Sequence, residues 1–123
     1  MAENKEYFTQ EMENGSIQIS EDVVASVTGM AVLEVEGVCG LSSTIGTDIA
    51  EMLGMKTLSK GVRLSSTESG ALRIDCDVVA KFGQNIFELA KNVQENVKSS
   101  VESVTGLTVG EVNVTVCGIA LPK

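Results

Sequence analysis

The sequence predicts an α+β fold, with a small mixed or antiparallel open sheet and two main helices packed on one of its faces. Several segments alternate strictly between apolar and polar residues, which indicates strands that bury one side only. Two other segments carry a single apolar stripe at helical spacing, so both helices can cover the same side of a sheet. The elements follow in the order strand, helix, three strands, helix, strand.

The first half of the chain begins with a polar segment, 1–14, that lacks periodicity and predicts a flexible N-terminal tail. A single domain then spans 15–121. It opens with the short strand "GSIQIS", after which Ser20 is a suitable N-cap for a helix that runs to about Val35, with Gly37 just beyond its end. The helix is expected to bury Val23 or Val24, Val27, Met30 or Ala31, and Val35.

A short strand at 38–41 leads into the connection 42–60, which has a helical pattern of its own. Thr47 can cap this short helix, and Ile49, Met52 and Leu53 fall on one side of it. We interpret the segment as a lid over one end of the core. The alternative is a helix that contacts a partner through Met52 and Met55, since methionine-rich surfaces adapt to partners.

Two strands, 61–67 and 71–82, are joined by "ESG", which predicts a hairpin turn. Alternation divides the second strand into two faces. The apolar face carries Leu72, Ile74, Cys76 and Val78, and the other face carries Arg73, Asp75, Asp77, Val79 and Lys81.

The second helix is the clearest element, because Asn85 can cap it and Gly106 can end it. Its apolar stripe consists of Ile86, Leu89, Ala90, Val93, Val97, Val101 and Val104. The last strand again alternates, with Val112, Val114 and Val116 on one face and Glu111, Asn113, Thr115 and Cys117 on the other.

Composition restricts the function. The 123 residues carry a net charge of −8, which disfavours binding to nucleic acids and to anionic membrane surfaces. The chain has no apolar run of about 18 residues that would insert into a membrane, and its N-terminus has no apolar core of a secretory signal. We therefore expect a cytoplasmic protein.

The sequence offers few of the residues from which a catalytic site is usually built. The chain has no histidine, and its three cysteines lack metal-binding spacing. Cys76 is expected in the core, Cys117 is expected to be exposed, and Cys39 can be either. Asp75 and Asp77 point the same way, roughly 7 Å apart, but Arg73 and Lys81 beside them indicate a solvated face of mixed charge. We expect no enzyme, no cofactor and no metal site.

The succession "GSIQIS", "LEVEGVCGL", "KGVRL", "LRIDCDVVAKFGQNI", "VQENVKSSVESVTGL" and "VGEVNVTVCGI" resembles the alkaline shock protein family, the YloU-like and Gls-type envelope stress response proteins of mainly Gram-positive bacteria. The resemblance covers about residues 15–120. It implies a small non-enzymatic α+β protein of cell-envelope and alkaline or general stress homeostasis. It also implies self-association and attachment to the membrane through a separate membrane-anchored partner.

Two hypotheses follow. The first is a protein-interaction or scaffold module, with contact residues Arg73, Asp75, Asp77, Lys81, Asn113, Thr115, Met52 and Met55, and with open sheet edges available for strand pairing. The alternative is a thiol-dependent redox or small-molecule-binding protein that uses Cys117 or Cys39.

Overall fold

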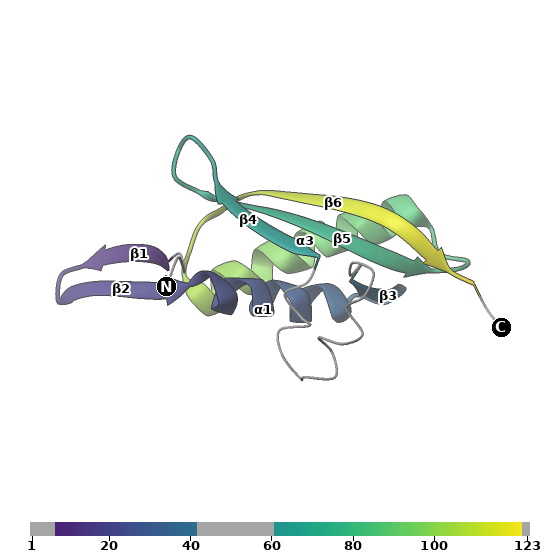
Figure 1. Ribbon diagram of the computed structural model, residues 1–123, viewed down its shortest axis with the longest axis horizontal. Coiled ribbons are helices and arrows are strands. Elements are labelled where there is room, and N and C mark those ends of the chain that lie inside the picture. Colours follow the sequence, from purple (N-terminus) through teal and green to yellow (C-terminus); the bar gives the residue numbers. More distant parts are fainter. Residues whose placement is uncertain (1–6, 42–60, 122–123) are drawn as a thin grey trace, which may run out of the picture.

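The computed structural model describes residues 7–41 and 61–121 of the chain. The predicted lid helix near Thr47, with Met52 and Met55, lies outside these residues. The described elements are β1 (Tyr7–Met12), β2 (Gly15–Ser20), α1 (Glu21–Leu33), β3 (Val38–Leu41), β4 (Val62–Ser66), β5 (Leu72–Lys81), α3 (Ile86–Thr105) and β6 (Val109–Ala120) (Figure 1).

β5 lies in the middle of the main sheet. It pairs in parallel with β6 on one side, from Leu72 opposite Val109 to Lys81 opposite Ala120. On its other side β4 and β3 lie end to end, antiparallel to the first and last parts of β5. Because a parallel pair needs a long crossover, α3 connects β5 to β6. The sheet is therefore mixed and open, as the sequence predicts.

Both helices cover the same face of this sheet (Figure 1). Alternation along β5 turns every second residue toward them, and these residues are buried without exception. The core they form with the helices is aliphatic, as expected for a chain with so few aromatic residues. It includes Leu72, Ile74, Cys76, Val78 and Ala80 of β5, Val24, Ala31 and Val32 of α1, and Leu89, Val93, Val97 and Val101 of α3.

The predicted helix caps are confirmed. The Ser20 hydroxyl accepts a hydrogen bond from the Val23 N–H at 3.3 Å, and the Asn85 side-chain oxygen accepts one from the Glu88 N–H at 3.0 Å. Gly106 ends α3 at a φ of 78°, in the left-handed region that glycine adopts at low cost.

The end of the first helix differs from the prediction. α1 stops at Leu33, and two tight turns follow, in which the Val35 N–H bonds to the Val32 carbonyl and the Val38 N–H to the Val35 carbonyl. Gly37, with a φ of 97°, thus lies in the turn into β3. The apolar spacing persists through this turn, which is why the sequence pattern extends the helix too far.

Val104 is a second correction, because it is 65% exposed and not part of the core. It lies in the last helical turn of α3, and its side chain lines an open groove with Val27 and Met30 of α1. An apolar stripe predicts which side of a helix faces the core, but it does not predict where the packing of two helices leaves a groove between them.

Residues 7–12 form a strand where the sequence predicts a flexible tail. β1 pairs antiparallel with β2, from Tyr7 opposite Ser20 to Met12 opposite Gly15, and this hairpin extends from the N-terminal end of α1 (Figure 1). The Gln10 side chain also donates to the Gly106 carbonyl at 2.9 Å. Backbone pairing and this distant contact hold the strand in place. Neither requires apolar alternation in the sequence, which is why the sequence pattern did not predict the strand.

Candidate interaction surfaces

The side of the sheet turned away from the helices is polar, and we call it the outer face. Neighbouring strands place its side chains in rows, because Arg73 lies opposite Glu111, Asp75 opposite Asn113 and Asp77 opposite Thr115. The predicted contact residues on this face are Arg73, Asp75, Asp77, Lys81, Asn113 and Thr115, of which Lys81, Asn113 and Thr115 are exposed and the others half-buried.

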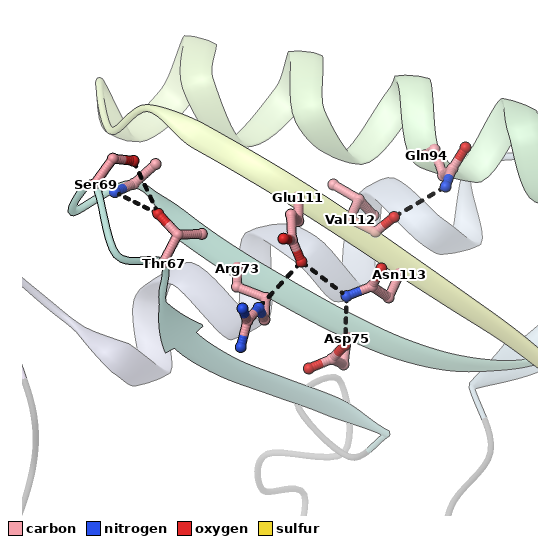
Figure 2. A network of polar contacts seen from close by, with 9 residues as sticks. Thr67, Ser69, Arg73, Asp75, Gln94, Glu111, Val112 and Asn113 are labelled. Atoms are coloured by element: carbon pink, nitrogen blue, oxygen red, sulfur yellow. Dashed lines mark hydrogen bonds and ion pairs between the residues drawn. The ribbon is translucent and has the colours of Figure 1, made fainter.

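A chain of polar contacts joins β5 to β6 across the outer face (Figure 2). Arg73 Nε donates to Glu111 Oε1 at 3.1 Å, and Asn113 Nδ2 donates to Asp75 Oδ1 at 2.9 Å. The same Asn113 amide reaches Glu111 Oε1 at 3.4 Å. Each carboxylate on this part of the face therefore has a donor from the neighbouring strand.

Arg63 of β4 is a member of the face that sequence reasoning missed. Its guanidinium binds the two carboxylate oxygens of Asp77 at 2.8 and 3.2 Å. The hydrogen bond from Arg63 lowers the pKa of Asp77, and the same bond raises the pKa of Arg63. Alternation along β4 signals that Arg63 is outward, but the diagonal contact with Asp77 follows from the register that the hairpin sets.

The charges of the outer face cancel. The face carries three cations and three anions, namely Arg63, Arg73 and Lys81 and Asp75, Asp77 and Glu111. The net charge of −8 therefore comes from residues elsewhere on the chain. Within the described residues, no group of three or more His, Cys, Asp or Glu residues is placed to hold a metal ion. The arrangement is a surface of balanced charge that contains two ion pairs, Arg63 with Asp77 and Arg73 with Glu111.

Cys76 and Cys117 lie where the alternation predicts them. Cys76 is fully buried, and burial raises the pKa of its thiol to about 12. Cys117 is exposed and sits at a bulge in β6, where its thiol donates to the Val78 carbonyl at 3.5 Å. Cys39, which the sequence left open, is exposed on β3.

The β6 edge that faces away from β5 is covered over its first part by side chains of α3. The Gln94 amide donates to the Val112 carbonyl at 3.0 Å (Figure 2). At the start of β6, Lys98 donates to the Val109 carbonyl at 3.0 Å, and Glu102 accepts from the Val109 N–H at 2.9 Å. These three contacts occupy backbone groups with which another strand would pair.

Within residues 7–41 and 61–121, no such side-chain contact covers the second part of β6, residues 113–120. We call this part the open edge. Since backbone groups on alternate residues of a strand point the same way, the N–H and C=O groups of Val114 and Val116 point outward like the Val112 carbonyl. Both valines are only partly buried. The stretch from Val112 to Leu121 contains no charged residue.

Comparison with known proteins shows the family to which the chain belongs. The model of the alkaline shock protein 23 family, described by its cell envelope-related function, matches residues 9–121. The chain belongs to this family. The resemblance read from the sequence motifs is thereby confirmed, and with it the coarser part of the predicted function, a relation to the cell envelope.

Relatives from two Gram-positive bacteria match nearly the whole chain. The uncharacterized protein Spy1614 of Streptococcus pyogenes is 39% identical over 108 residues, which cover 86% of this chain and 88% of the relative. The uncharacterized Bacillus subtilis protein YloU is 36% identical over 107 residues, covering 85% and 88%, and YqhY of the same organism is 31% identical over 105 residues, covering 85% and 77%. No solved structure is significantly similar to the chain. Neither helix in the described part of the chain is long and apolar enough to cross a membrane.

Proposed function

We propose that the protein is a non-enzymatic interaction module that joins proteins at the cell envelope, and that copies of it associate through the open edge of β6. In this proposal the chain is cytoplasmic and reaches the membrane through a membrane-anchored protein partner, as the family resemblance implies. The outer-face residues, with Met52 and Met55, are further candidate contacts.

The open edge is the observation that supports the proposal. Natural sheets usually protect a long edge strand with lysine, proline or a covering element, since its free backbone groups otherwise pair with another chain. β6 has twelve residues, and α3 covers only its first part. Two open edges paired antiparallel would complete each other's backbone hydrogen bonds and bury more of Val114 and Val116.

The thiol alternative has weaker support. A reactive thiolate needs a nearby cation or base, whereas the contact that the Cys117 thiol makes is with a backbone carbonyl. Binding to nucleic acid is disfavoured by the net charge of −8.

Light scattering coupled to size exclusion tests the association. We expect a mass well above the 12.9 kDa of one chain, and a shift toward the monomer in Thr115→Lys, because antiparallel pairing would bring two lysines close together. Ser99→Lys, exposed on α3, is the matched control and should leave the mass unchanged. A monomeric wild type, or equal masses for Thr115→Lys and wild type, would contradict association through β6.

Fractionation tests the envelope relation separately. The tagged protein should sediment with membranes when its host's membrane proteins are present, and should not bind protein-free vesicles of the same lipids. Binding to the bare vesicles would contradict attachment through a protein partner.

A further inference from the structure

A groove runs along the seam between α1 and α3, and we call it the helix groove. It consists of two adjoining hollows of about 310 Å³ and about 400 Å³. Ser26, Val27, Met30, Ala31, Glu34, Ser100 and Val104 line the first hollow, and Glu34, Val35, Glu36, Asn92, Glu95 and Asn96 line the second. Because Glu34 lines both, the two hollows form one continuous surface.

One half of the helix groove is apolar. Met30 is 49% exposed and Val104 is 65% exposed, and they stand beside the partly buried Val27. Small side chains, Ser26 and Ser100, complete this half. Large apolar side chains left in water within a concave surface indicate a place where another apolar surface docks.

The other half is acidic. Glu34, Glu36 and Glu95 all line it. Asn96 stands at the junction of the halves, where its Nδ2 donates to the Ala31 carbonyl at 2.7 Å and to Glu34 Oε1 at 3.2 Å. These bonds join the two helices and fix the apolar half relative to the acidic half.

No lysine or arginine lines the helix groove among the described residues. The two lysines of α3 are engaged elsewhere. Lys98 binds Glu102 and the Val109 carbonyl of β6, and Lys91 lies over the Phe87 ring at 5.8 Å from its centroid. Residues 20–41 contain four acidic residues and no basic one. The charge of the groove therefore favours a cationic occupant.

We propose that the helix groove binds an amphipathic helical segment of a partner protein, with apolar residues along one face and lysines or arginines at one end. The lining residues of α3 run from Asn92 to Val104, and at a rise of about 1.5 Å per residue they span about 18 Å, or roughly three helical turns. Apolar side chains at i, i+3 or i+4, and i+7 of the partner pack on Met30 and Val104, and its basic end meets Glu36 and Glu95. The inference extends the proposed function to a second surface, distinct from β6.

Fluorescence anisotropy with a labelled synthetic peptide tests the proposal on the full chain. The probe is an alanine-based helix of about 15 residues, with leucines at i, i+3 and i+7 and three lysines in one terminal turn. Its matched partner has glutamates in place of the lysines. We expect saturable binding of the lysine peptide that weakens as salt rises, and at least tenfold weaker binding of the glutamate peptide.

Two double variants test the contribution of each half of the groove to peptide binding, and both keep side-chain size nearly unchanged. Met30→Gln with Val104→Thr removes apolar contact, and Glu36→Gln with Glu95→Gln removes charge. Each is expected to weaken binding about tenfold, and only the charge variant should reduce the salt dependence. Phe87→Gln, 72% exposed outside the groove, and Glu68→Gln in the β4–β5 turn are the matched controls and should bind like wild type.

Three results would overturn the proposal: no binding of the lysine peptide, equal binding of both peptides, or wild-type affinity in both double variants. A drop in self-association in Met30→Gln with Val104→Thr, without peptide binding, would assign the groove to a second copy of the chain instead. Thr115→Lys must keep wild-type peptide binding, so the failure of β6 pairing and the failure of the groove are separable.

Discussion

Glu102 on α3 accepts a hydrogen bond from the backbone N–H of Val109, the first residue of β6, at 2.9 Å. Lys98, one turn earlier on the helix, contacts both the Glu102 carboxylate and the Val109 carbonyl at 3.0 Å. The hydrogen bond from Val109, followed by that from Lys98, lowers the pKa of Glu102. These contacts tie the end of α3 to the start of the edge strand.

Glu102→Gln is expected to lower the Tm at neutral pH, because it removes the charge while an amide oxygen can still accept from Val109. The folded pKa lies below the ordinary value of 4.5. The contribution of the carboxylate is therefore complete above pH 4.5 and is lost as the pH falls through the lower folded value. Thermal unfolding of both proteins across this range should show a Tm difference at pH 7 that closes in acid. A difference that does not change with pH would contradict this account.

Gly37→Ala is expected to destabilise the fold by about 1–2 kcal/mol, because Gly37 has a φ of 97° that a side chain disfavours. A Cβ there would also meet Gln84 Oε1 at 2.6 Å and Leu89 Cδ1 at 3.0 Å. Gly40→Ala is the control, since a Cβ at Gly40 meets nothing within 4 Å, and it should stay within about 0.5 kcal/mol of wild type. Urea denaturation measures both, and equal stabilities would show that the turn tolerates a side chain.

Ile74→Ala is expected to cost about 2–5 kcal/mol, because Ile74 is fully buried between β5 and the helices. Ile119→Ala makes the same chemical change on β6, where the side chain is 48% exposed, and should cost within about 0.5 kcal/mol. The midpoints of chemical denaturation compare the two. Similar losses in both variants would mean that the core does not extend along β5 as described.

Thiol titration of the native protein should detect Cys39 and Cys117 and not Cys76. Both reactive residues are exposed, whereas Cys76 is buried and its thiol pKa is about 12. The third thiol should react only after denaturant is added. Rapid reaction of all three thiols in the native state would contradict the burial of Cys76. An exposed thiol that reacts much faster than a small-molecule thiol would revive the redox alternative.

Much of this architecture could be predicted from the sequence, because it rests on periodicity. Apolar residues at every second position from Leu72 to Val78 determined which side of β5 is buried. Apolar residues at every fourth position from Leu89 to Val101 determined the inner side of α3. Capping chemistry likewise marked the start of each helix at Ser20 and Asn85. These are local features, since each depends on residues within a few positions of one another.

Tertiary structure alone decided which strands are neighbours, and so which side chains meet. The contact of Arg63 with Asp77 depends on strand register, the strand at 7–12 depends on pairing with β2, and the exposure of Val104 depends on the groove that α1 and α3 leave between them. The open edge of β6 and the helix groove arise in the same way. A residue's own neighbours in sequence determine its local conformation and the direction of its side chain, but burial and pairing depend on segments that only folding brings together.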